Sequence, residues 1–260
     1  MKKVFPVVIA FIMPFMLHAG SLNFRPLTAN VFEPRTGSVY QAGTEKLRLD
    51  IGASHDLKKW HKKNSVISFG GDFFTYTRLR TAGKFKFPVE TSDYYFGING
   101  ALVSENGLQL RTRLAHISSH LVDGLADSIT FIREPFVYSR EFLEFTAACN
   151  FSGLRPYAGI NFIFSSIPDD NSMIVPNLGL DYLYRINSFI DLSAGYDFKL
   201  TGINGISSGN NAAQAGIIFR TMDQYGIFFS AYYYAGKSMH GMFYKDYDEY
   251  FGIGFQLVYY

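Results

Sequence analysis

The chain has 260 residues, of which 24 are basic and 22 are acidic, and its only cysteine is Cys149. This nearly even charge balance excludes the basic excess of a typical nucleic-acid-binding protein. A single cysteine excludes an intramolecular disulfide and a structural zinc site built on several cysteines.

The first twenty residues, "MKKVFPVVIAFIMPFMLHAG", are typical of a secretory signal peptide. Two lysines precede an apolar run, and small residues allow cleavage after Ala19 or Gly20. Beyond this segment no apolar run is long enough for a membrane helix. An exported chain in which aromatic residues make up 17% then fits two classes. One is a soluble β-protein of the periplasm, and the other is an outer-membrane β-barrel.

Residues 21–39 contain two prolines and alternate weakly, which predicts a periplasmic tail or a plug-like segment. From residue 40 to residue 260, apolar and polar residues alternate with a period of two, as in β-strands. The predicted strands are 40–54, 64–80, 92–103, 107–120, 135–150, 154–166, 175–186, 188–200, 211–222, 224–235 and 249–260. Several exceed the usual length of soluble strands and match the 9–11 residues that span a membrane.

The connections between these strands decide between the two classes. From residue 104 onward they alternate between short turns, such as "SENG" and "NFSG", and long loops, such as 121–134, 201–210 and 236–248. This alternation is typical of a transmembrane antiparallel β-barrel with tight periplasmic turns and long outer loops. Bacterial barrels have even strand numbers. Eleven strands are recognised, so we expect twelve, with ten as the alternative, and we expect the barrel to lie in the outer membrane of a Gram-negative-type bacterium.

The strand 107–120 carries an unusual polar pattern, which ends in "RLAHISSH". Its leucines share one parity, which should face lipid, while Arg111 and Arg113 share the other and should face the lumen, because an unpaired charge in hydrocarbon is costly. On the next strand Arg140 and Glu144 also belong to the lumen set. His116, Ser118 and Glu141 all fall on the lipid-facing set.

An antiparallel register that pairs His116 with Glu141 also pairs Ser118 with Ser139 and Arg113 with Glu144. Residues i and i+2 of a strand lie on one face about 6.5–7 Å apart. We therefore predict that Ser118 is a nucleophile, that His116 is its base, and that Glu141 orients the imidazole. At the boundary of acyl chains and head groups, the substrate would be a lipid ester.

Two resemblances bear on these predictions, the first on the site and the second on the barrel alone. His116 and Ser118 resemble the His-x-Ser pair of the outer-membrane phospholipase and lipid A deacylase barrels, whereas Glu141 matches their polar partner only by its place on the following strand. Most of the chain resembles a Gram-negative family, domain of unknown function 1207, which implies an outer-membrane protein without an assigned activity. The matching segments are "FRPLTANVFEPR", "LRLDIG", "DYYFGI", "RTRLAHISSHLVDG", "YSREFLEF", "LRPYAGI" and "YAGKSMHGMF".

A non-catalytic barrel is the alternative, either a narrow pore or a structural or surface-contact protein, in which the histidines belong to the polar belt at the membrane interface. Asp123 and Asp127 are expected to be solvated loop charges, although they could bind calcium. No other cofactor or metal is expected. The expected partners are outer-membrane lipids and the barrel-assembly machinery, and the oligomeric state is left open.

Overall fold

The computed structural model describes residues 22–83, 86–122, 124–127, 130–131, 134–222 and 225–259. The expected signal peptide lies outside these residues. Among them, no helix is long and apolar enough to cross a membrane.

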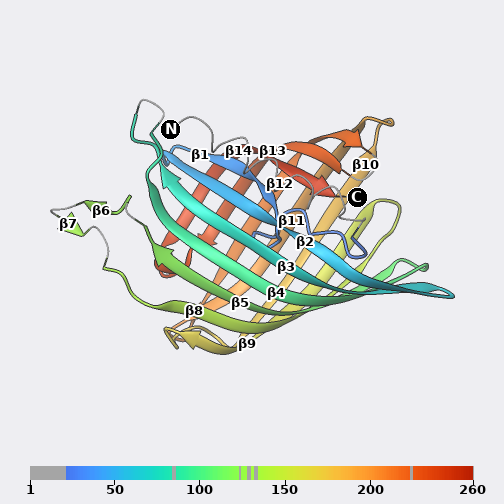
Figure 1. The fold of residues 1–260 in the computed structure, drawn as a ribbon, viewed down its shortest axis with the longest axis horizontal. Coiled ribbons are helices and arrows are strands. Elements are labelled where there is room, and N and C mark those ends of the chain that lie inside the picture. Colours follow the sequence, from blue (N-terminus) through green and yellow to red (C-terminus); the bar gives the residue numbers. More distant parts are fainter. Residues whose placement is uncertain are drawn as a thin grey trace, which may run out of the picture.

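Twelve strands of the described chain close into one antiparallel barrel, in which β1 pairs with β14 and completes the ring (Figure 1). They are β1 (Thr36–Ala42), β2 (Lys46–Lys62), β3 (Ser65–Arg80), β4 (Val89–Ser104), β5 (Leu108–Leu121), β8 (Tyr138–Cys149), β9 (Leu154–Ile167), β10 (Ile174–Arg185), β11 (Ile190–Ile203), β12 (Ile206–Met222), β13 (Tyr225–Lys237) and β14 (Tyr247–Tyr259). The prediction of a twelve-stranded transmembrane barrel is confirmed.

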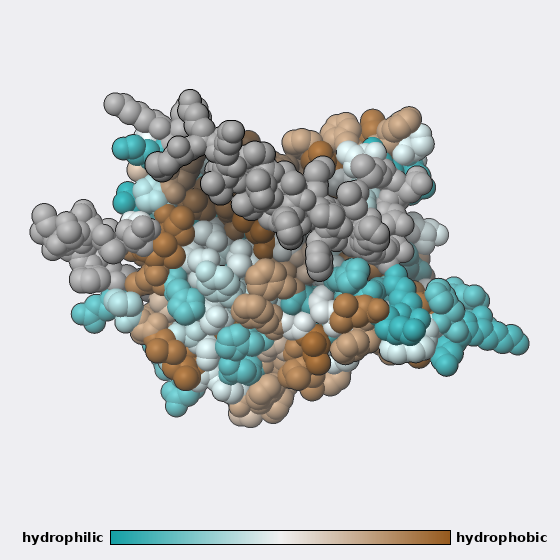
Figure 2. All heavy atoms as spheres, viewed as in Figure 1, coloured by the Kyte–Doolittle hydropathy of each residue, from teal (hydrophilic) through white to brown (hydrophobic). Residues whose placement is uncertain are grey.

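The two faces of the wall differ in polarity, as the alternation predicts. Leu110, Leu114 and Phe145 are exposed on the outer face, whereas Arg113 and Asp181 are buried inside. A soluble protein buries apolar residues and exposes charges, so this reversed distribution fits a barrel whose outer face contacts hydrocarbon. Hydrophilic side chains gather beyond one end of the barrel, where the β2–β3 hairpin projects (Figure 2).

We call the end at which β1 begins and β14 finishes the terminal end, and the opposite end the loop end. Residues 22–35 lie inside the barrel and enter its core. Leu27 is buried, Arg155 donates hydrogen bonds to the carbonyls of Arg25 and Pro26, and the Thr28 amide donates to Asp181. This segment then leads directly into the barrel wall at Thr36, four residues earlier than the sequence predicts.

The expected strand 40–54 is wrong, because a tight turn divides it into the end of β1 and the start of β2. Gly43 and Glu45 adopt positive φ angles of 78° and 54°. Such a backbone ends a strand and reverses the chain. The division supplies the twelfth strand that the even-number rule requires.

The expected long loop 201–210 is also wrong. β11 and β12 remain paired up to Ile203 and Ile206, so the connection is only Asn204-Gly205. Both residues have positive φ, which is the geometry that an Asn-Gly hairpin turn provides.

The connection between β13 and β14 folds back over the loop end. It contains a short 3-10 helix, η1 (Gly241–Phe243), whose three residues are buried. The Gly241 amide donates to Asp93 on β4, and the Met242 amide donates to the Ser119 hydroxyl on β5. The connection between β5 and β8 instead forms a separate two-stranded hairpin of β6 (Ala126–Asp127) and β7 (Thr130–Phe131).

Candidate functional site

The polar site on the outer wall is built by β5 and β8 near the loop end. The register of this pair places His116 opposite Glu141, Ser118 opposite Ser139 and Arg113 opposite Glu144. The predicted register is therefore confirmed. It follows from the period of two, because a slip of one residue would carry Arg113 to the lipid face and Leu114 into the lumen.

His116 and Glu141 are joined by a hydrogen bond of 2.7 Å between Nδ1 of the ring and Oε1 of the carboxylate. Their side chains are 40% and 29% exposed, in keeping with a place on the outer wall. The ring of Phe96, opposite His116 on β4, lies 6.5 Å away between centroids. With Nδ1 donating to the carboxylate, Nε2 of the neutral imidazole carries the free lone pair and can accept a proton.

Ser118 lies two residues beyond His116 on the same face of β5, between Tyr94 of β4 and Ser139 of β8. In the described chain no hydrogen bond joins its hydroxyl to the histidine ring. His116 and Ser118 thus lie on the same surface without a hydrogen bond between them. Catalytic hydrogen bonds are often long in the absence of substrate and tighten when it binds.

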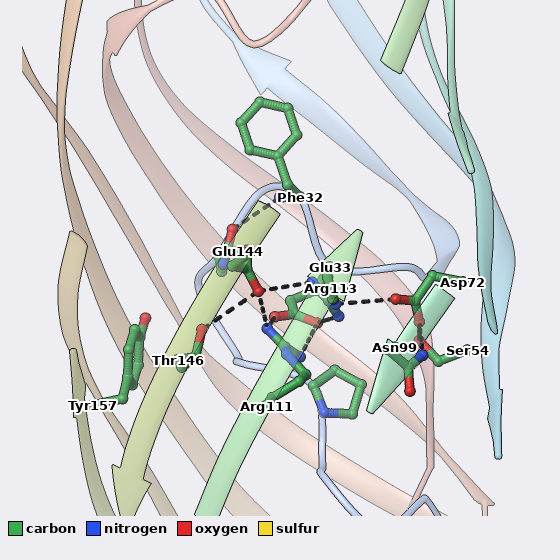
Figure 3. A network of polar contacts seen from close by, with 12 residues as sticks. Phe32, Glu33, Ser54, Asp72, Asn99, Arg111, Arg113, Glu144, Thr146 and Tyr157 are labelled. Atoms are coloured by element: carbon green, nitrogen blue, oxygen red, sulfur yellow. Dashed lines mark hydrogen bonds and ion pairs between the residues drawn. The ribbon is translucent and has the colours of Figure 1, made fainter. Parts of the chain in front are cut away.

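A second polar cluster lies inside the lumen (Figure 3). Glu33, from the N-terminal segment, accepts two hydrogen bonds from Arg111, at 2.6 and 3.0 Å, and one from Arg113, at 2.5 Å. Glu144 on β8 lies 3.0 Å from Arg111, and Asp72 on β3 lies 3.0 Å from Arg113. These five side chains are all buried, so two cations and three carboxylates link the N-terminal segment to the barrel wall.

Arg140 also faces the lumen, closer to the loop end. Its guanidinium lies 5.3 Å from the ring centroid of Phe32 and 5.6 Å from that of Phe142. The four residues expected to line the lumen are therefore all inside the barrel: Arg111, Arg113, Arg140 and Glu144. His116, Ser118 and Glu141, which we call the outer-wall trio, lie on one face of β5 and β8. Three members of the lumen cluster, Arg111, Arg113 and Glu144, lie on the opposite face of the same two strands.

Glu33 was not recognised from the sequence as a partner of the two arginines. It is separated from Arg111 by 78 residues, and no periodic pattern connects an irregular segment to a strand. The available signal was chemical: two arginines facing a lumen need more negative charge than Glu144 alone supplies.

The calcium prediction concerns Asp123, which lies outside the described residues, and Asp127, whose side chain is not described. It stays a prediction. Among the described residues, no group of three or more His, Cys, Asp or Glu side chains is arranged to hold a metal ion.

Comparison with known proteins identifies the family. The family model described as "Protein of unknown function (DUF1207)" matches residues 87–259, so the chain belongs to that family. No curated protein matches the sequence of this chain.

Several solved structures share this fold at low sequence identity. Outer membrane phospholipase A from Escherichia coli is 12% identical with a TM-score of 0.54, over 95% of this chain and 96% of that one. The outer membrane phospholipase dimer of Salmonella typhi with bound calcium is 11% identical with a TM-score of 0.54, over 91% and 94%. The β domain of the Bordetella autotransporter BrkA is 14% identical with a TM-score of 0.54, over 87% and 97%. At this identity the likeness shows the shared outer-membrane barrel fold alone.

Proposed function

We propose that this member of the DUF1207 family is a lipid-ester hydrolase of the outer membrane, acting on phospholipid or lipid A at the outer leaflet. The observation that carries the proposal is the 2.7 Å bond between His116 Nδ1 and Glu141 Oε1 on a wall that faces hydrocarbon. Ser118 follows on the same face. The fold that the chain shares with outer membrane phospholipase A of Escherichia coli supports the location and the class of substrate.

In this proposal His116 carries the proton between Ser118 and the substrate, and Glu141 only orients the ring. Glu141 remains ionised and fixes the imidazole with its proton on Nδ1. Nε2 of His116 then removes the hydroxyl proton of Ser118 as Oγ attacks the ester carbonyl. The imidazolium returns that proton to the departing alcohol oxygen, which leaves an acyl-serine. Water, deprotonated by the same Nε2, releases the fatty acid and restores the serine.

The position of the site favours a lipid as its substrate. A polar pair on the outer wall of a barrel loses hydration and gains no apolar burial, so it is not explained by stability alone. The ester groups of membrane lipids lie at the boundary of acyl chains and head groups. A substrate in the outer leaflet would reach Ser118 by lateral diffusion, without passing through the lumen.

The alternative is a non-catalytic barrel, in which His116 and Glu141 only stabilise two strands at the interface. Within that alternative, an open pore is disfavoured, because the N-terminal segment and its buried contacts with Arg111 and Arg113 occupy the lumen. A structural or surface-contact role remains the competing explanation.

The decisive experiment measures fatty-acid release from phospholipid and from lipid A by the refolded barrel, with and without calcium. Ser118→Ala and His116→Ala should each lower the rate by roughly 10²–10⁴-fold, and Glu141→Gln should lower it less. His120→Ala is the matched control, because this histidine is exposed on the same strand and face but is outside the trio. Release that is unchanged in Ser118→Ala, or absent in the wild-type barrel, would leave the non-catalytic alternative.

A further inference from the structure

A cavity lies in the lumen between the tip of the N-terminal segment and the β13–β14 connection. We call it the loop-end cavity, and it continues into a smaller space that shares four of its lining residues, Phe32, Arg140, Lys199 and Thr201. Its wall combines aromatic rings with hydroxyl and amide groups, among them Tyr138, Asn171, Asn210, Tyr234, Ser238 and Tyr244. Neither the outer-wall trio nor the cluster around Glu33 uses these groups.

Arg140 is a cation of this wall for which the described part of the chain supplies no anionic partner. Its Nε atom is buried without a hydrogen-bond partner, and no ion pair involves its guanidinium within the described residues. The group lies near the rings of Phe32 and Phe142, at 5.3 and 5.6 Å. These rings attract a planar cation but accept no ordinary hydrogen bond from its Nε–H.

The carboxylates that line the cavity and its extension are already engaged. Asp197 is bonded to Lys199 and to the Tyr157 hydroxyl, and Glu144 is bonded to Arg111 in the deeper cluster. Lys237, another lining residue, donates its Nζ to a backbone carbonyl rather than to an acid. The cavity therefore carries an excess of positive charge in a setting where buried charges are normally paired.

We propose that the loop-end cavity binds a small oxyanion, such as a phosphate or carboxylate group, with Arg140 as its principal contact. The planar fork of a guanidinium bonds two oxygens of such a group at once. The hydroxyls of Tyr138 and Ser238 are further candidate donors in the wall, whereas those of Tyr234 and Tyr244 already donate to Lys237 and Asp170. Asn171, Ser238 and Tyr244 come from connections at the loop end, so the ligand enters from that side of the barrel.

Isothermal titration of the refolded full-length barrel with inorganic phosphate tests this site. We expect saturable binding of one phosphate per chain, weakened at least tenfold in Arg140→Gln and weakened less in Arg140→Lys, which keeps the charge but loses the fork. Arg185→Gln is the matched control, because its side chain is 62% exposed at the terminal end, and it should bind phosphate as the wild type does.

A second titration, with the short-chain lipid dihexanoyl phosphatidylglycerol, distinguishes free phosphate from a lipid head group. Binding of either probe that depends on Arg140 supports the oxyanion site and identifies its source. Binding of neither probe, or binding that Arg140→Gln leaves unchanged, overturns the proposal. The melting temperature of each variant shows that loss of binding is not loss of the fold.

Discussion

Replacing Glu33 by glutamine should release the N-terminal segment from the lumen while the barrel stays closed. The carboxylate accepts three charge-assisted hydrogen bonds from Arg111 and Arg113, and it is 1% exposed. The amide of glutamine offers one acceptor oxygen and turns two donors toward guanidinium groups that are donors themselves.

The free-energy cost of this substitution depends on the anionic partners that Arg111 and Arg113 retain. Breaking a buried ion pair usually costs about 3–5 kcal/mol, because a charge is left uncompensated. Here Arg113 retains Asp72 at 3.0 Å and Arg111 retains Glu144 at 3.0 Å. The cost should therefore lie near the lower limit, about 3 kcal/mol, which corresponds to a roughly 100-fold rise in the population of the detached segment.

Hydrogen exchange of residues 22–35 measures this population, with the strands of the barrel as the internal reference. Glu45→Gln, an exposed glutamate in the turn between β1 and β2, should leave the exchange unchanged. A rise below about fivefold in Glu33→Gln, equivalent to roughly 1 kcal/mol, would refute the reasoning. Equal acceleration of the strands would also refute it, because Glu33 would then hold the barrel rather than the segment.

Three further predictions concern the wall, the lumen and the loop end. Leu114→Arg places a charge on the outer face of β5 and should lower the free energy of unfolding in liposomes by about 2–4 kcal/mol, as measured by urea titration; a loss below 1 kcal/mol would mean that this face does not meet hydrocarbon. Gly195→Val should displace the N-terminal segment, because a Cβ at this position would lie 2.7 Å from the Thr28 Cβ. Protease cleavage near Thr28 should therefore increase. The control Gly83→Val, in an exposed turn, should leave cleavage near Thr28 unchanged. At the loop end, burial raises the pKa of Asp170, but hydrogen bonds that include one from Lys245 more than offset it and hold the pKa below its ordinary value. The contact thus stabilises the connection 168–173 at pH values above the ordinary carboxyl pKa, and this stabilisation is lost as the pH falls through the lowered pKa. Hydrogen exchange of residues 168–173, corrected for intrinsic rates, should therefore rise in acid in the wild type but not in Asp170→Asn.

Much of the barrel could be predicted from the sequence because its strands repeat with a period of two. The side chains of β5 and β8 alternate between lipid and lumen, and the favourable pairing of Arg113 with Glu144 selects one register. That register then brings His116 and Glu141 together. The outer-wall site was therefore accessible to reasoning about neighbouring strands alone.

The two errors in strand assignment have a local cause. At Gly43 and at Asn204-Gly205 the chain reverses within two or three residues through positive φ angles. The alternation of apolar and polar residues continues across the turn at Gly43 but ends before the turn at Asn204-Gly205. The hydrophobic pattern therefore placed the strand ends at both turns wrongly. The turn chemistry, rather than the period, decides where those strands end.

By itself the sequence determined the class of fold, the two faces of the wall and the pairing of adjacent strands, since each depends on periodicity and on neighbours along the chain. Only the tertiary structure decided where residues 22–35 lie, that Glu33 joins two arginines, and that Arg140 lies beside a cavity with no anionic partner among the described residues. These contacts join an irregular segment and a distant loop to strands across the lumen. Their energies come from desolvated charges brought together by closure of the barrel, for which the order of residues carries no periodic signal.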